Sequence, residues 1–154
     1  MDILELNKRI KSIDKNLLMQ QAVEMNEKQI LALNKKQLLQ GIDATGAKIK
    51  PKYKRDKKGD VSRYAHKKAQ MNPTPGLETP DLRFSGEMYR EMDLVAGIPN
   101  DKEYTITSYV DYLKYLIPKY GDVFNLTKEN VEKLKKKITN DYLKLWAKKA
   151  GLSS

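Results

Sequence analysis

Two arrangements of residues between 66 and 91 resemble catalytic ones. Ser85-Gly86 marks an expected change from extended chain to helix, the order of elements in which some hydrolases place a nucleophilic serine. The glycine pattern that precedes such a serine is missing, and nothing in the sequence links Ser85 to His66, the sole histidine. Lys67 and Lys68 also disfavour a protonated imidazole, since like charges repel. These residues therefore argue against a serine–histidine centre.

The second arrangement is a pair of carboxylates, Glu87 and Glu91, on one face of an expected helical turn. That spacing suits general acid–base catalysis or a metal, but Arg83 and Arg90 are interleaved with the two glutamates, which is more typical of an ion-paired surface. The absence of cysteine and the single histidine exclude cysteine-type zinc sites, multi-histidine sites and disulfides. Without a glycine-rich phosphate loop, we expect no catalytic, metal or cofactor-binding residues, and no enzyme.

The net charge of +10 is distributed unevenly along the 154 residues. Residues 41–70 carry ten basic and three acidic side chains, for +7, and residues 113–154 carry ten and four, for +6. Residues 71–112 carry three and eight, for −5. This separation suits a subunit that meets copies of itself or a polyanion. No apolar run approaches the roughly 20 residues of a membrane span, so we expect a soluble, intracellularly made protein with no membrane partner.

Residues 1–38 are predicted to form a helical N-terminal arm. Asp14 is placed to restart the helix after a bend. One apolar stripe recurs at steps of three and four residues: Ile3, Leu6, Ile10, Ile13 and Leu17. Such a stripe is either part of the intramolecular core, the more usual case, or a surface for a partner.

Residues 39–126 are predicted to form an α+β core that opens with a turn. Gly41, Asp43 and Gly46 are typical turn residues, and Gly46 would tolerate a positive φ. Alternating apolar residues around them predict a β-hairpin or β-arch that begins near Leu39.

An extended, strongly basic loop is predicted over residues 50–79, with a short helix from Ser62 to Met71. Loops of this length are usually functional or disordered. We expect its central cations to contact DNA, without reading sequence, or a neighbouring subunit: Lys52, Lys54, Arg55, Lys57 and Lys58.

The remaining elements follow from local signals. Ser85 is predicted to cap a short helix, which is followed by an antiparallel hairpin with its loop at Pro99–Asp101 and a helix interrupted at Pro118. A C-terminal amphipathic helix is predicted over residues 127–150, capped by Thr127 and ended by Gly151. Its expected buried stripe is Val131, Leu134, Ile138, Tyr142 and Leu145. We therefore predict a single α+β domain over residues 1–154.

The order of these parts resembles the tail-completion, virion-morphogenesis family of tailed bacteriophages, which includes tail terminators and head–tail joining proteins. Three turns carry the resemblance, which spans residues 30–150. Gly41, Asp43 and Gly46 are similar to the family's first turn. The other matched residues are Leu82, Ser85, Gly86, Met88 and Tyr89 before the hairpin, and Tyr120, Gly121, Phe124 and Leu126 before the last helix. The chain departs from the family pattern in its long helical N-terminus and in having Ile49-Lys50-Pro51 where the family has Trp-Pro.

The resemblance implies a structural subunit of a virion neck or tail, made in the host cytoplasm and holding no cofactor. Such a subunit would form a homo-oligomeric ring, join portal, neck or tail proteins, and contact DNA passing through its channel. The alternative is a stand-alone, sequence-nonspecific nucleic-acid-binding protein that uses the basic loop at residues 48–68.

Overall fold

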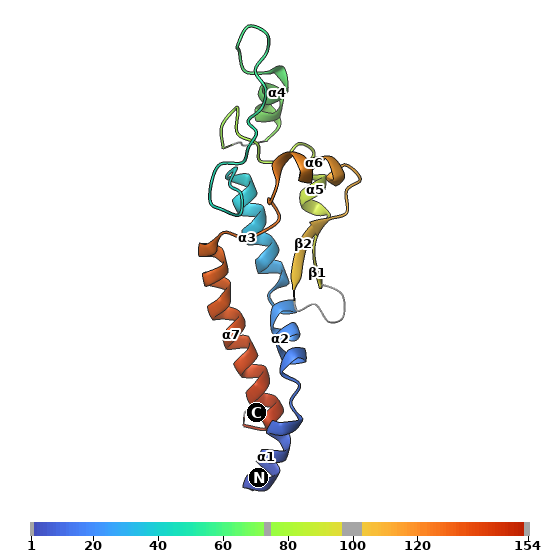
Figure 1. The fold of residues 1–154 in the computed structure, drawn as a ribbon, viewed down its shortest axis with the longest axis vertical. Helices are drawn as coiled ribbons and strands as arrows, with labels where there is room; N and C mark the ends of the chain where they lie inside the picture. The colour runs from blue at the N-terminus through green and yellow to red at the C-terminus, as the bar shows by residue number, and fades with distance from the viewer. Residues whose placement is uncertain (1, 73–74, 97–102, 153–154) are drawn as a thin grey trace. The chain divides into compact units, whose positions relative to one another are not determined.

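The structure is a computed structural model that describes residues 2–72, 75–96 and 103–152 (Figure 1). It confirms the α+β class, because the described residues form seven helices and a two-stranded antiparallel sheet. The chain divides into two compact units, residues 1–29 with 131–154 and residues 30–130. The prediction of one domain stays a prediction. None of the described helices has both the length and the apolarity needed to cross a membrane.

The first unit contains α1 (Ile3–Ser12) and α2 (Lys15–Glu24), each begun by an aspartate. Asp2 Oδ1 accepts a hydrogen bond from Glu5 N at 2.7 Å, and Asp14 Oδ1 accepts one from Asn16 N at 2.9 Å. These caps satisfy amide groups that have no partner within the helix. The restart predicted at Asp14 is therefore confirmed.

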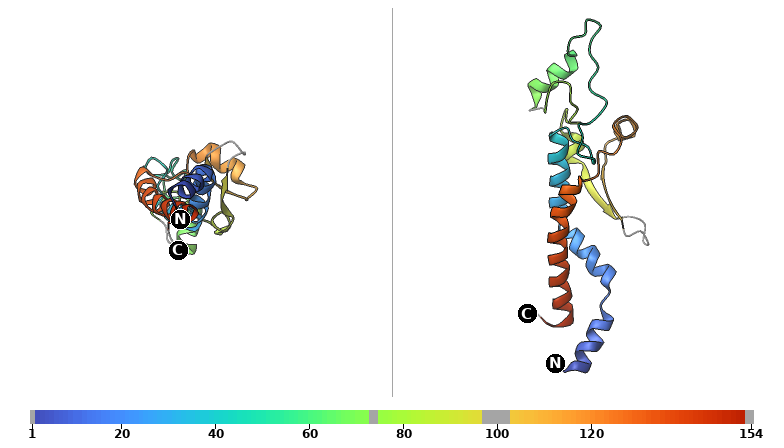
Figure 2. Two further views of the ribbon diagram at one scale, coloured as in Figure 1. Left: turned by 90° about the horizontal axis from the view of Figure 1, so that it is seen from below. Right: turned by 60° about the vertical axis from the view of Figure 1, so that its left-hand side comes forward.

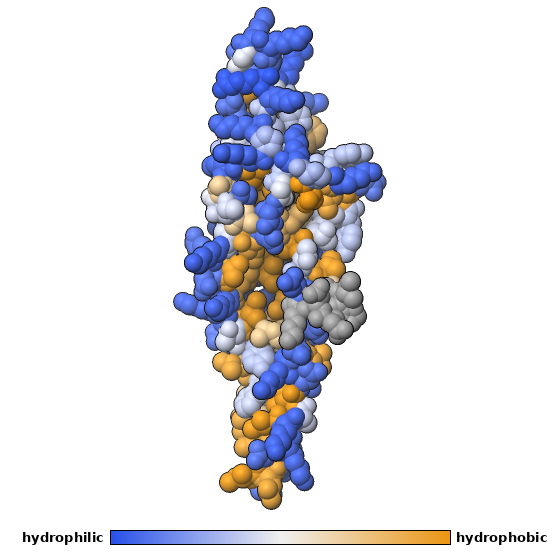
Figure 3. All heavy atoms as spheres, viewed as in Figure 1, coloured by the Kyte–Doolittle hydropathy of each residue, from blue (hydrophilic) through white to orange (hydrophobic). Residues whose placement is uncertain are grey.

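The prediction that the N-terminal stripe belongs to the core is wrong for Ile3, which is 80% exposed, and holds only in part for Leu6 and Ile10, which are half-buried; no residue of α1 is fully buried. The reason is the break between the helices. Ile13 and Asp14 have extended backbones, which interrupts the helical phase, so that Leu18 is buried (2% exposed) and Leu17 is not (48%). Figure 3 shows hydrophobic residues at the surface of α1.

The long C-terminal helix α7 spans Lys128–Ala150. Thr127 Oγ1 accepts a hydrogen bond from Asn130 N at 3.4 Å, and Gly151 ends the helix with φ +76°, as the sequence predicts. Leu134 is buried, but the expected stripe fails at Val131, which is 46% exposed. The other three predicted positions are half-buried, so this helix keeps much of its apolar stripe at the surface.

The second unit contains most of α3 (Glu27–Leu39), from Ile30 on, and the pairing of β1 (Met92–Ala96) with β2 (Tyr104–Ser108). In this antiparallel pair Leu94 lies opposite Ile106, which is buried. Two short helices flank the hairpin in sequence, α5 (Glu87–Arg90) and α6 (Leu113–Tyr120). The predicted loop at Pro99–Asp101 lies outside the described residues.

The interruption predicted at Pro118 is wrong, because α6 continues through it to Tyr120. Proline removes one amide donor and its ring crowds the preceding turn. The helix has only eight residues and ends two residues later, where Gly121 N donates to Ile117 O at 2.9 Å. The missing bond therefore falls in the last turn.

Two buried amide side chains of α3 hold the turn that precedes α7. Asn34 Nδ2 donates to Val123 O at 3.1 Å and to Asn125 O at 3.2 Å. Gln37 Nε2 donates to Asn125 O at 2.9 Å, and Gln37 Oε1 accepts from Thr127 N at 2.9 Å. Side chains thus supply partners that the irregular backbone of the turn lacks.

Replacing Asn34 by alanine is expected to lower the free energy of unfolding by about 1–3 kcal/mol, because Val123 O would lose its donor while it stays buried. Urea unfolding measures the change. Asn140, exposed on α7, is a matched control in which the same substitution should shift stability by less than about 0.7 kcal/mol. Equal effects at the two positions would contradict the prediction.

Candidate functional site: the basic loop and the tyrosine pocket

The turn at residues 41–49 is organised by one carboxylate. Asp43 Oδ1 accepts hydrogen bonds from Thr45 N at 2.8 Å, Thr45 Oγ1 at 2.6 Å and Ala47 N at 3.2 Å. Gly41 and Gly46 have φ values of +67° and +86°, a region that favours glycine. The helix α3 continues to Leu39, where a hairpin was expected to begin, and Ile42 pairs with Lys48 only as an isolated bridge. The segment is thus a tight turn and not a hairpin.

This first turn lies against two other segments of the second unit. A Cβ atom added to Gly41 would come within 2.5 Å of Thr79 Cγ2 and 2.9 Å of Pro75 Cγ, so the chain after the basic loop passes directly over it. Ala44 N donates to Asp122 O at 3.3 Å, which joins the first turn to the turn before α7. Two of the three turns that carry the resemblance to the bacteriophage family are therefore in contact.

The remaining turn, Ser85-Gly86, begins α5 but not as predicted. Gly86, with φ +80°, occupies the N-cap position, and Ser85 precedes it. Ser85 Oγ accepts a hydrogen bond from Glu87 N at 3.3 Å, so the hydroxyl supports the first amide of the helix from one residue further back. The expected capping by Ser85 is corrected to a glycine N-cap with serine support.

The candidate catalytic groups are not assembled into one site. His66 is exposed on α4 (Arg63–Met71), and among the described residues no hydrogen bond joins it to Ser85. Glu87 and Glu91 are both exposed at α5. Across the described ranges, no group of three or more histidine, cysteine or acidic side chains is arranged to hold a metal ion.

The basic loop, residues 48–68, is ordered by its own side chains. Asp56 Oδ1 accepts from Lys58 N at 2.8 Å and Asp60 N at 2.9 Å, and Arg55 pairs with Val61 across an antiparallel bridge. Arg55 also donates to Glu78 Oε1 and to Gly59 O, each at 2.8 Å. Arg55 therefore has a structural role in the loop. In Figures 1 and 2 the loop and α4 lie side by side, and Figure 3 shows this region as hydrophilic.

The four predicted lysines of the loop have a different environment from Arg55. Lys52, Lys54, Lys57 and Lys58 are exposed, and in the described part of the chain no carboxylate pairs with them. Lys57 and Lys58 lie in the turn closed by Asp56. The structure thus presents these ammonium groups to solvent together, on one ordered loop.

Where the loop returns to the rest of the second unit, a lysine and an aspartate are buried together. Lys68 of α4 is 1% exposed and donates from Nζ to Asp81 Oδ1, and Asp81 is fully buried. Asp81 Oδ1 also accepts a hydrogen bond from Arg83 N at 2.9 Å, and the Tyr89 hydroxyl donates a hydrogen bond to Asp81 O. Burial, with the Arg83 guanidinium as a smaller cause, lowers the pKa of Lys68 to about 8. The ammonium group is therefore charged at neutral pH and paired with the carboxylate.

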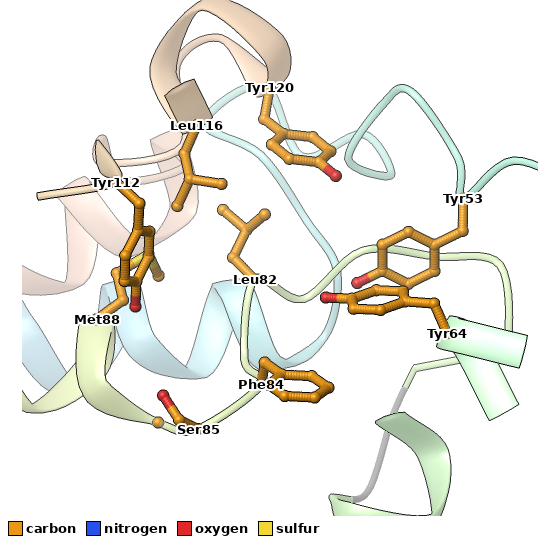
Figure 4. A pocket seen from close by; sticks show the side chains of 10 residues that line it. Tyr53, Tyr64, Leu82, Phe84, Ser85, Met88, Tyr112, Leu116 and Tyr120 are labelled. Atoms are coloured by element: carbon orange, nitrogen blue, oxygen red, sulfur yellow. The ribbon is translucent and has the colours of Figure 1, made fainter. Parts of the chain in front are cut away.

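A pocket of about 260 Å³ lies near this ion pair, since Leu82, the residue after Asp81, is one of its lining residues. Figure 4 shows the side chains that line it. We call it the tyrosine pocket, and it is lined by Tyr53, Tyr64, Leu82, Phe84, Ser85, Gly86, Met88, Tyr112, Leu116 and Tyr120. Tyr64 stacks on Phe84 with ring centroids 5.6 Å apart and meets Tyr53 edge to face at 5.3 Å. Leu82, which has a φ of +56°, projects into the space between the walls.

The hydroxyl groups of Tyr53 and Tyr64 remain protonated at neutral pH. Burial, followed by the neighbouring Tyr64 and Tyr120, raises the pKa of Tyr53. Burial and Tyr120 likewise raise the pKa of Tyr64. Both phenols can therefore donate as well as accept hydrogen bonds. Figure 4 shows their hydroxyl groups pointing the same way, toward Leu82.

Sequence reasoning identified the basic loop but missed the pocket and the buried pair. The only available signal was the presence of Tyr53 and Tyr64 among the lysines. The other walls come from residues 82–88 and from α6, which are distant in sequence. No family model, curated protein or solved structure matches this chain.

Proposed function

We propose that this chain is a structural subunit of a tailed-bacteriophage virion, a ring-forming head–tail connector or tail-completion protein. The observation that carries the proposal is the apolar stripe of α1, which the described residues cover only in part: Ile3 is 80% exposed, and Leu6 and Ile10 are half-buried. A capped helix whose apolar face is not fully buried by its own chain is typical of a docking element. The three turns shared in pattern with the tail-completion family support the choice of class.

Further features of the chain agree with assembly into a ring. Among the residues that the structure describes, β1 and β2 form a sheet of two strands, so each has an outer edge to which a strand of another chain could be added. The basic residues 41–70 and the acidic residues 71–112 also allow unlike charges of neighbouring copies to meet head to tail, a contact that closes into a ring. In such a ring the exposed lysines of the basic loop would line the DNA channel or contact a neighbour.

Light scattering after size exclusion tests the proposal. The chain should form particles several times its mass of 17.8 kDa, and electron micrographs should show closed rings. Replacing Ile3 by glutamate should weaken the assembly about tenfold or more, because burial of an isoleucine contributes about 1.5–3 kcal/mol. A glutamate in the first turn also favours the helix, so the substitution should leave α1 folded.

Leu4 supplies the matched control for this experiment. It is 74% exposed, against 80% for Ile3, and lies in the same helical turn but off the stripe. Leu4→Glu should therefore assemble like the unmodified chain. A compact 17.8 kDa monomer at all concentrations, or equal effects of the two substitutions, would overturn docking through the α1 stripe.

A second candidate function is favoured by a separate observation, the four exposed lysines of the basic loop that pair with no described carboxylate. A stand-alone nucleic-acid-binding protein would use these groups on phosphates, with affinity that falls steeply as salt is added. Ring formation is not needed for this activity. The two candidates therefore separate in the light-scattering experiment.

A further inference from the structure

The tyrosine pocket is too small to enclose a drug-sized ligand. Its volume of about 260 Å³ lies below the ~300–1,000 Å³ of pockets that bury most of such a ligand. Its walls are aromatic on one side, and two of the rings are open to solvent, with Tyr64 49% and Phe84 38% exposed. The pocket therefore suits one ring of a larger molecule, inserted against an aromatic surface.

The charges around the pocket disfavour a positively charged occupant. Lys68 Nζ lies 5.4 Å from the centre of the Tyr53 ring, and Lys119 Nζ lies 5.0 Å from the centre of the Tyr120 ring. Since these aromatic faces already carry ammonium groups, a further cationic side chain would be repelled. At Tyr112, another lining residue of the pocket, burial and then the Glu87 carboxylate raise the pKa, and the Arg90 guanidinium lowers it.

The polar groups of the pocket argue against a purely apolar occupant. The hydroxyl groups of Tyr53, Tyr64 and Tyr120 belong to its lining. An aliphatic side chain would remove them from water without offering hydrogen bonds, which costs free energy. A planar heterocycle with donors and acceptors at its edge would stack on the rings and also bond the hydroxyls.

The segments that form the aromatic wall also carry the basic residues. Lys52 and Lys54 flank Tyr53 in the chain, and both are exposed. On α4, Arg63 precedes Tyr64 and Lys67 follows one helical turn later. A stacking surface bordered by cations is the combination by which proteins hold unpaired bases and their phosphates.

We propose that the tyrosine pocket binds an unpaired base of a single-stranded nucleic acid, stacked on the Tyr64–Phe84 pair, while lysines of the basic loop contact the adjoining phosphates. This inference rests on the second candidate function, in which the loop contacts nucleic acid. It does not depend on ring formation. It adds that single strands are preferred over duplex, in which paired bases are not free to enter a pocket.

Fluorescence anisotropy of the full chain with labelled DNA tests the proposal. The probes are an oligothymidylate of about 20 nucleotides, a duplex of the same length, and a strand of the same length built from abasic sites. The oligothymidylate should bind about 5- to 150-fold more tightly than the abasic strand, the range expected for stacking of one base. It should also bind more tightly than the duplex. Because this comparison uses the unmodified chain, it does not depend on how a variant folds.

Two substitutions test whether the base binds in the tyrosine pocket. Phe84→Ala removes the stacking ring but keeps the backbone carbonyl that accepts from Asn72 Nδ2 at 2.9 Å. It should lower affinity for oligothymidylate about 5- to 150-fold without changing the salt dependence. Tyr115→Ala is the matched control, because Tyr115 is 68% exposed, has Lys114 over its ring, and lies outside the pocket. It should bind as the unmodified chain does.

The double substitution Lys57→Ala and Lys58→Ala separates the two kinds of contact. It should reduce the slope of log affinity against log salt by up to about 1.4, because each contact of a cation with a phosphate of a single strand contributes about 0.7. If the duplex and the abasic strand bind as tightly as oligothymidylate, the base pocket is overturned while the second candidate function stands. If no probe binds, both are overturned.

Discussion

Replacing Lys68 by methionine is expected to lower the free energy of unfolding by about 3–5 kcal/mol. The side chain is 1% exposed and donates to Asp81, which is fully buried. Methionine keeps much of the volume but leaves the Asp81 carboxylate without its counter-charge in a site closed to water. Removing one partner of a buried pair costs more than the pair itself contributes, because the other charge remains desolvated. Urea unfolding followed by circular dichroism measures the loss.

The double substitution Lys68→Met with Asp81→Asn should recover part of that loss, since the neutral amide can still accept from Arg83 N. Glu5→Gln is the control, because it breaks the pair between Arg9 and Glu5 at 2.7 Å, whose side chains are about half exposed. That change should cost less than about 0.5 kcal/mol. Equal losses in Lys68→Met and Glu5→Gln would contradict a buried charge pair.

Replacing Gly41 by alanine is expected to cost about 2–5 kcal/mol. Two effects add at this position. The φ of +67° is unfavourable for any residue with a Cβ atom, and that atom would lie 2.5 Å from Thr79 Cγ2 and 3.1 Å from Pro80 O. Because Pro80 O belongs to the backbone, relief of the contact requires the chain after the basic loop to move. The same unfolding measurement applies.

Gly46 separates the two effects. Its φ of +86° is similar, but no atom lies within 4 Å of the position that a Cβ would take. Gly46→Ala should therefore cost only the conformational part, about 1–2 kcal/mol. The difference between the two substitutions measures how closely the returning chain packs on the first turn. If alanine at Gly41 costs no more than at Gly46, that packing is not present.

The sequence predicted the features that depend on a few neighbouring residues. Asp14 begins a helix, Thr127 caps another, and Gly151 ends it, because each acts on amide or carbonyl groups within one turn of itself. The hairpin of β1 with β2 could also be predicted from neighbouring residues, since alternation of apolar and polar residues indicates a half-buried strand.

The candidate site could not be predicted in the same way, because it depends on contacts between distant segments. Lys68 appears in the sequence as one more lysine of a basic stretch, and only the approach of Asp81 makes its burial tolerable. The walls of the tyrosine pocket likewise come from Tyr53, from Tyr64 and from helix α6. Periodicity describes one element at a time, so it carries no information about which elements meet.

If the proposed contact with nucleic acid is made, the turn closed by Asp56 affects how strongly its lysines bind the polyanion. The carboxylate fixes the amides of Lys58 and Asp60, and the isolated bridge between Arg55 and Val61 fixes the two ends of the turn. A disordered arm would lose backbone entropy on contact, roughly 1–2 kcal/mol for each residue that becomes ordered. Here the backbone is already preorganised, so in such a contact only side-chain freedom would be lost and more of the electrostatic attraction would appear as affinity.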